Sequence, residues 1–240
     1  MIKVENIEVW GFEHAIRGMR NPLNSWSKSD SHRCGWEMMT ESCDECGKLN
    51  GAYDDGVCLS DEEFYCIGDN DLNLMKRLFN AGTEHRKYLR QIFVSMDIIA
   101  PLYWWKEFDT YKVGTVANSC STMHKIAAKE FVVEDFSYEH LTDGGIDVLS
   151  NICDELNLQR DFWLDTKEKC YWWGMIQLLP SSYNQRRTVT MNYENVFSII
   201  KQRSGHKLDE WNEFVKILKT LPYVMEIGGM NDKGESEDKE

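Results

Sequence analysis

The sequence has no run of apolar residues close to the roughly 20 that a membrane-spanning helix needs, so we expect no membrane partner. Its first residues, Met1–Glu8, lack the apolar block of a secretion signal, and we therefore expect a cytoplasmic protein. Basic residues are also few: 27 Lys and Arg stand against 40 Asp and Glu, a formal net charge of −13. This deficit argues against binding to duplex nucleic acid, whose affinity comes from neutralised phosphates. It still permits a small anionic ligand held by a few local cations.

What the chain does contain is the composition of an ordinary globular protein. It has 240 residues, of which 42% are hydrophobic and 28% charged, enough for one large domain or two small ones. Apolar periodicity predicts a mixed α and β fold in which helices dominate. The predicted strands are 1–12 and 91–99, and the predicted helices are 11–24, 69–80, 102–108, 138–141, 146–158, 159–179, 193–202 and 208–221.

The helix predicted from Asp69 begins with a capping signature, Asp69-Asn-Asp-Leu72. A polar, Cys-rich insertion is predicted at about 26–68, within a single domain of 1–227. The last residues, 228–240, form an acidic tail that we expect to be disordered.

The insertion holds five of the eight cysteines, and their spacing indicates a metal site. Cys43-Asp-Glu-Cys46-Gly47 has the two-residue spacing of a zinc knuckle. Cys58 and either Cys34 or Cys66 would complete a Cys₄ site, with His32 as a further alternative. A structural zinc ion would hold together a segment that has too few apolar residues to fold by itself. Free thiols in a reducing cytosol, or a disulfide formed during purification, are the alternatives.

The zinc site gives a first prediction. Protein purified without added metal is expected to contain zinc by elemental analysis, away from any nucleotide site, because the thiolates of a formed site retain the ion. Zinc far below one ion per chain, together with five freely titrating thiols, would contradict it.

The segment Pro101–His124 is rich in aromatic residues and then in small hydroxyl and amide residues. Its aromatic rings offer stacking faces for a planar ligand, and its polar side chains offer hydrogen bonds to phosphate or carbonyl oxygens. Alternatively, the aromatics belong to the core and the hydroxyls cap helices or turns. The polar candidates are Lys106, Tyr111, Lys112, Thr115, Asn118, Ser119 and Ser121.

Two other segments gather positive charge. The first, Gly82–Arg90, includes the candidates His85 and Arg90, although a solvated helix start would look the same. The second is Arg203-Ser-Gly-His206, where Arg203 either binds a ligand or interacts with the C-terminal end of a helix.

Taken in order, these segments resemble the flavin-dependent thymidylate synthase (thymidylate synthase-complementing) family, over about 1–25 and 69–222. The resemblance lies in Asn70-Asp-Leu followed by Leu74, Leu78 and Ala81-Gly82, and in Pro101-Leu-Tyr-Trp-Trp-Lys-Glu-Phe108. It continues in Leu179-Pro180, Thr188, Asn192, Arg203, His206 and Glu210-Trp211. The family's Arg-His-Arg motif is replaced by Thr110-Tyr111-Lys112, and Cys120 stands at a family serine, which suggests a divergent, phage-type branch.

The resemblance implies a thymidylate synthase-complementing-like α/β (α+β) fold, with a central antiparallel sheet flanked by helices. It also implies a homotetramer with active sites between subunits, bound FAD, and reductive methylation of dUMP or a related pyrimidine nucleotide with methylene-tetrahydrofolate. In that family an Arg corresponding to Arg203 holds the nucleotide, and no protein nucleophile is required. The alternative is a catalytically degenerate homologue that keeps the fold and binds a nucleotide without the chemistry.

Overall fold

The computed structural model describes residues 2–33, 53–54, 57–58 and 65–230, with only the backbone at 53–54 and 57–58. The chain divides into two compact units, each described separately below. The sheet unit comprises Met1–Glu8, Ser95–Met191 and Arg203–Val215. The second unit comprises Val9–Val94, Asn192–Gln202 and Lys216–Glu240. Among the described residues, no helix combines the length and the apolar character needed to cross a membrane.

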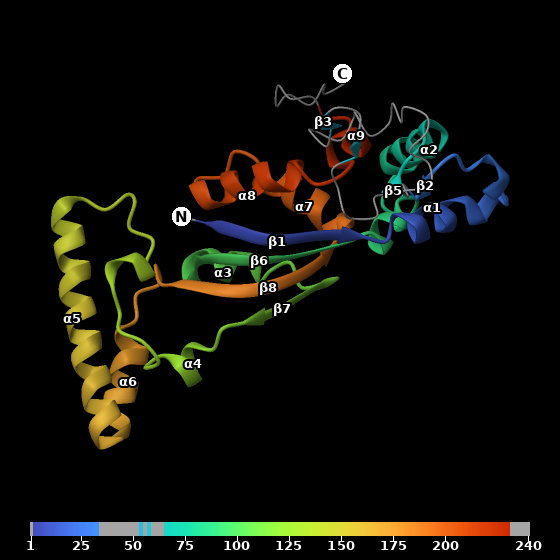
Figure 1. Ribbon diagram of the computed structural model, residues 1–240. Coiled ribbons are helices and arrows are strands. Elements are labelled where there is room, and N and C mark those ends of the chain that lie inside the picture. The colour runs from blue at the N-terminus through green and yellow to red at the C-terminus, as the bar shows by residue number, and fades with distance from the viewer. Residues whose placement is uncertain (1, 34–52, 55–56, 59–64, 231–240) are drawn as a thin grey trace. The chain divides into compact units, whose positions relative to one another are not determined.

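A four-stranded sheet in the order β1-β6-β8-β7 organises the sheet unit (Figure 1). Its strands are β1 (Lys3–Trp10), β6 (Phe93–Pro101), β8 (Asn184–Asn192) and β7 (Thr115–Ser119). The edge strand β7 pairs antiparallel with β8, with Thr115 opposite Met191 and Ser119 opposite Arg187. Mixed α and β structure with an antiparallel sheet is therefore confirmed.

Alternate residues of β6 and β8 face the core. Met96, Ile98 and Ala100 are buried, and the residues between them, Asp97 and Ile99, are half-buried, which is the alternation of a strand with one covered face. In β8, Val189 and Met191 are buried in the same manner.

Helix α3 (Leu102–Phe108) supplies the aromatic centre of this core. Trp104, Trp105 and Phe108 are at most 2% exposed. The Trp104 ring lies 4.6 Å from that of Trp211 and 5.3 Å from that of Phe214, which belong to the part of α8 (Asp209–Lys219) in this unit. These three aromatic rings of α3 therefore pack in the core, which was the alternative to a role in stacking against a planar ligand.

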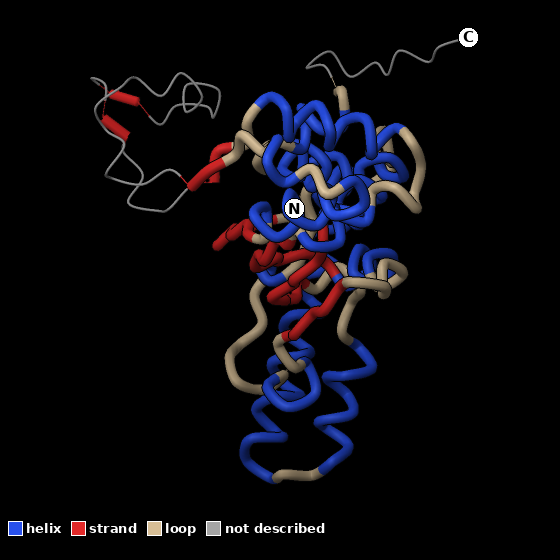
Figure 2. Tube along the Cα trace, turned by 90° about the vertical axis from the view of Figure 1, so that its right-hand side faces the viewer, coloured by secondary structure: helices blue, strands red, loops and turns tan. Residues whose placement is uncertain are grey.

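A helical hairpin forms the rest of the sheet unit. Helices α5 (Asp143–Thr166) and α6 (Lys169–Leu178) lie side by side and extend away from the sheet (Figure 2). A second apolar cluster fixes them to the preceding loop; it contains Ile126, Phe131, Phe136, Leu149, Cys153, Leu156 and Met175. Between β7 and the hairpin lie α4 (Thr122–Lys125) and a 3₁₀ turn at Val133–Asp135.

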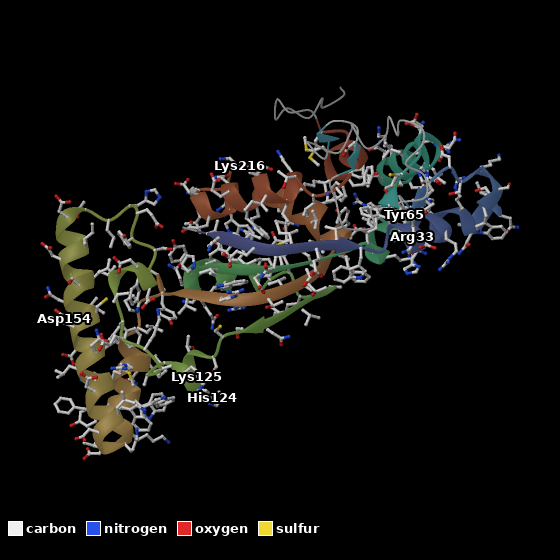
Figure 3. The ribbon with its side chains drawn as sticks, viewed as in Figure 1. Arg33, Tyr65, His124, Lys125, Asp154 and Lys216 are labelled. Atoms are coloured by element: carbon white, nitrogen blue, oxygen red, sulfur yellow. The ribbon has the colours of Figure 1, made fainter. Side chains whose placement is uncertain are left out.

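The second unit is mainly helical. It contains α1 (Phe12–Arg20), α2 (Asp69–Asn80), the residues of α7 (Tyr193–Arg203) up to Gln202, and α9 (Val224–Gly228). Short strands β2 (His32–Arg33) and β5 (Tyr65–Cys66) pair antiparallel, with Arg33 opposite Tyr65 (Figure 3). Strands β3 (Tyr53–Asp54) and β4 (Val57–Cys58) form another two-stranded ladder. Most of the predicted insertion, and 231–240 of the predicted tail, lie outside the described residues.

Three local predictions are wrong. The helices predicted at 146–158 and 159–179 are instead α5, which continues to Thr166, and α6. Nothing in the sequence around Leu158 breaks a helix, and the chain turns where Lys167 adopts a left-handed conformation. Residues 138–141 form a turn, not a helix, because Thr142 accepts a hydrogen bond from the Gly145 amide and so starts α5 there.

The third error concerns the cap of α2, which begins at Asp69 as predicted, but its N-cap residue is Gly68, which has no side chain to cap the helix. Asp30 accepts hydrogen bonds from the amides of Asn70 and Asp71 instead. A residue about 40 positions earlier in the chain therefore satisfies the first free amides of the helix.

Candidate functional site

Arg203, the last residue of α7, is held by residues from α3 and the following turn. Its Nε donates to the Tyr111 hydroxyl at 2.9 Å, and its Nη1 donates to Glu107 Oε2 at 2.6 Å. The guanidinium carbon lies 4.5 Å from the centre of the Trp211 ring and 5.6 Å from that of Tyr111. Two aromatic rings and a carboxylate therefore fix this cation in one orientation.

Glu107 is the centre of the polar contacts. Besides Arg203, its Oε2 accepts from the Trp211 Nε1 at 2.9 Å and lies 3.5 Å from His206 Nε2. The Leu208 amide donates to His206 Nδ1 at 3.1 Å, which sets the orientation of the imidazole ring. We call these five residues, Glu107, Tyr111, Arg203, His206 and Trp211, the Arg203 cluster.

The charged groups of the cluster are partly shielded from water. The Arg203 side chain is 18% exposed and that of Glu107 35%. Their attraction is therefore stronger than that of a fully exposed pair. Lys106 and Lys112 are exposed and form no ion pair within the described part of the chain.

Strand β7 presents the predicted hydroxyl and amide candidates along the sheet edge. Asn118 lies opposite Thr188 and Ser119 opposite Arg187 in the ladder, and both are exposed. Ser121, beyond the strand, accepts a hydrogen bond from the His124 amide and so caps α4. For Ser121 the capping alternative is therefore observed.

A carboxylate network on the sheet adds Asp97, Asn6 and Arg186, which the sequence did not single out. Asp97 of β6 accepts hydrogen bonds from Thr188 at 2.5 Å, Asn6 at 2.8 Å and Arg186 at 2.6 Å. These bonds, Thr188 first, hold the pKa of Asp97 well below its usual range. Polar residues at alternate positions, Arg186, Thr188 and Thr190, were the available sequence signal. Only the tertiary structure shows that Arg186 and Thr188 meet Asp97, whereas Thr190 meets Ser95.

The other predicted basic residues, His85 and Arg90, lie in the second unit. His85 is exposed in a turn, where its amide donates to the Gly82 carbonyl. The Arg90 Nε lies 4.0 Å from Glu194, which is also 3.4 Å from the Arg86 Nε. Within the described residues, Arg86 Nε and Glu194 Oε2 are buried without a hydrogen-bond partner. Glu194 thus offsets part of the positive charge predicted here.

Of the predicted nucleotide-site residues, the structure joins Tyr111 to Arg203 by a direct hydrogen bond. Thr115, Asn118 and Ser119 follow one another along β7. The sequence reasoning missed Glu107 as a partner of Arg203. Glu107 was visible in the sequence as an acidic residue beside Lys106 in an aromatic helix. It lies 96 positions from Arg203, so nothing in the sequence indicated that the two side chains meet.

Most of the predicted zinc ligands are not described. Cys34, Cys43 and Cys46 lie outside the described residues, and Cys58 belongs to β4 with no described side chain. Cys66 is buried and pairs with His32 across β2 and β5. Among the described residues there is no group of three His, Cys, Asp or Glu side chains suited to a metal ion, and the zinc site stays a prediction.

No protein-family model and no curated protein matches this sequence. Solved structures do match. Flavin-dependent thymidylate synthase ThyX from Helicobacter pylori, complexed with FAD and dUMP, is 15% identical, with a TM-score of 0.61 over 98% of this chain and 100% of that chain. A second H. pylori ThyX structure with FAD and dUMP has 15% identity and a TM-score of 0.59 over 94% and 96% of the two chains.

The UMP/dUMP methylase PolB from Streptomyces cacaoi, bound with 5-Br dUMP, is 10% identical, with a TM-score of 0.58 over 92% of this chain and 89% of that chain. The protein therefore has the fold of the ThyX structures, as the sequence resemblance predicted.

Proposed function

We propose that this protein binds a pyrimidine nucleotide and catalyses the reductive methylation of dUMP, or of a related nucleotide, with methylene-tetrahydrofolate and FAD. The observation that supports this most is the fold, which corresponds to 98% of this chain and to the whole of a ThyX chain complexed with FAD and dUMP. Similarity to PolB, a UMP/dUMP methylase, supports the same ligand class and the same kind of methyl transfer.

In the sheet unit, the proposal assigns nucleotide binding to the Arg203 cluster and its neighbouring lysines. Arg203 is fixed by Glu107 and Tyr111, so it offers a preorganised donor that loses little conformational freedom on binding. Lys106 and Lys112 offer exposed positive charge for a phosphate. The residues Thr115, Asn118 and Ser119 of β7 supply neutral hydrogen-bonding groups nearby in sequence.

FAD requires cations for its pyrophosphate, and the donors present fit such a group. Lys112 is exposed and unpaired within the described residues, and it stands in the segment where the family carries its flavin motif. His85 and Arg90, which lie in the second unit, stay sequence-based candidates for ligand binding. When bound, reduced FAD would supply a hydride for the one-carbon unit. The protein's part is then to bind and orient the ligands.

Arg203 provides the direct test. Arg203→Ala is expected to weaken dUMP binding at least about tenfold, because a positioned charge-assisted hydrogen bond is lost. Isothermal titration calorimetry measures the affinity, and circular dichroism verifies the fold. Lys201→Ala is the matched control, since it removes an exposed cation two residues earlier in α7. Equal dUMP affinity of Arg203→Ala and wild type would contradict the assignment.

A second function, nucleotide binding without catalysis, is favoured by one specific observation. The segment that replaces Arg-His-Arg, Thr110-Tyr111-Lys112, holds a single cation, and its Tyr111 hydroxyl already accepts a hydrogen bond from Arg203. A yellow protein with a flavin absorption band that rescues a thymidine-requiring bacterium would support the enzyme. A colourless protein that dUMP stabilises thermally, without rescue, would support the binding protein. Light scattering would test the proposed homotetramer in either case.

A further inference from the structure

Glu107 lies where an anionic ligand of Arg203 would bind. Its Oε2 accepts from Arg203 Nη1 at 2.6 Å and from Trp211 Nε1 at 2.9 Å. A phosphate oxygen binds a guanidinium through the same short, charge-assisted hydrogen bond. A phosphate approaching Nη1 would therefore have to displace this carboxylate and leave the Trp211 N–H without its acceptor.

The Nε group and the ring faces of the guanidinium are also occupied. Its Nε donates to Tyr111, and the rings of Trp211 and Tyr111 pack against its carbon at 4.5 and 5.6 Å. Nη2 alone among the three nitrogens has no hydrogen-bond partner within the described part of the chain. The side chain is 18% exposed, so a ligand has only a narrow approach.

The charge balance points the same way. Arg203 and Glu107 together carry no net charge, so their half-buried pair offers little attraction to a dianion. Asp109, two residues beyond Glu107, pairs instead with Arg187 at 2.7 Å. The exposed lysines Lys106 and Lys112 keep their charge without a carboxylate partner among the described residues.

We propose that Glu107 is a specificity-determining residue that neutralises Arg203 and excludes phosphate from it. Arg203 then donates through Nη2 to an uncharged oxygen of the ligand, and a ligand phosphate binds at the lysines. This rests on the proposed function for the identity of the ligand as a nucleotide, but the exclusion of phosphate is a property of these side chains alone.

The test uses inorganic phosphate and the full-length protein. Glu107→Gln keeps an acceptor oxygen for Arg203 and Trp211 and removes only the charge. This variant is expected to bind phosphate at least about tenfold more tightly than wild type in calorimetric titrations, because the positive charge of Arg203 is no longer compensated by a carboxylate. Glu107→Asp keeps the carboxylate and should bind phosphate like wild type.

Asp209→Asn is the matched control, because it removes one exposed negative charge from the start of α8, two residues before Trp211, and leaves no arginine without its carboxylate. Phosphate affinity of Glu107→Gln equal to wild type, or an equal gain in Asp209→Asn, would overturn the proposal. Should Glu107→Gln fail to fold, Arg203→Gln decides: unchanged phosphate affinity supports exclusion, and reduced affinity overturns it.

Nucleotides separate this inference from the proposed function. A gain of phosphate affinity in Glu107→Gln, with no binding of dUMP or deoxyuridine to any variant, would reject the function and keep the inference. Tight dUMP binding by wild type, without a gain of phosphate affinity in Glu107→Gln, would keep the proposed function and reject the inference.

Discussion

Replacing Trp104 with alanine is expected to lower the free energy of unfolding by about 3–5 kcal/mol. Trp104 is fully buried, and its ring contacts those of Trp105, Phe108, Trp211 and Phe214 at 4.6 to 5.3 Å. The substitution removes a tryptophan ring from the centre of this cluster and leaves a cavity that the surrounding rings cannot fill. For a chain of this size, Tm should fall by roughly 6–20 °C.

Trp104→Phe is the control for this prediction. Within the described residues, the indole Nε1 of Trp104 is buried without a hydrogen-bond partner, so its removal breaks no hydrogen bond. The phenylalanine variant should therefore lose far less stability than the alanine variant in denaturant unfolding. Equal losses would show that the aromatic packing is not what stabilises this core.

The second large effect is expected at Asp71, which is fully buried in the second unit. Its Oδ1 accepts from Arg20 Nε at 2.5 Å, and its Oδ2 accepts from the hydroxyls of Ser29 and Ser31, each at 2.7 Å. The Arg20 side chain is 5% exposed. Asp71→Asn leaves this arginine without a counter-charge, and we expect a loss of about 3–5 kcal/mol in the free energy of unfolding.

The pH dependence of the Asp71 effect follows from its pKa. Burial acts to raise the pKa of Asp71, but the hydrogen bonds from Ser31, Ser29 and Arg20 together outweigh it, so the pKa is lowered. A lowered pKa in the folded state gives stability that is complete above the unfolded value of about 3.9. That stability disappears as pH falls through the folded value.

The difference in stability between wild type and Asp71→Asn should accordingly shrink below about pH 4. Unfolding in urea at a series of pH values measures it. Glu13→Gln is the control: it breaks an exposed pair with Arg33, so little change is expected. A difference that stays constant down to pH 2 would mean that the Asp71 charge does not contribute.

Elements with a strong local pattern were predictable from the sequence. Helices α3, α7 and α8 and strand β6 lie close to where periodicity placed them, because their apolar residues already repeat at helix or strand spacing. The family resemblance rested on the same segments and gave the fold class. Arg203 was also singled out, since the segment Arg203–His206 gathers positive charge between two predicted helices of an acidic chain.

Other features were decided by contacts between distant residues. Strand β7 is short, polar and without alternation, and it is a strand because it pairs with β8, about 70 positions later. Whether Trp104 and Trp105 face a ligand or the core depends on where α8 packs, which their own segment does not encode. The cap of α2 comes from Asp30, and the partner of Arg203 is Glu107. Side-chain charge and burial at these positions are set by neighbours in space, and only the tertiary structure brings those neighbours together.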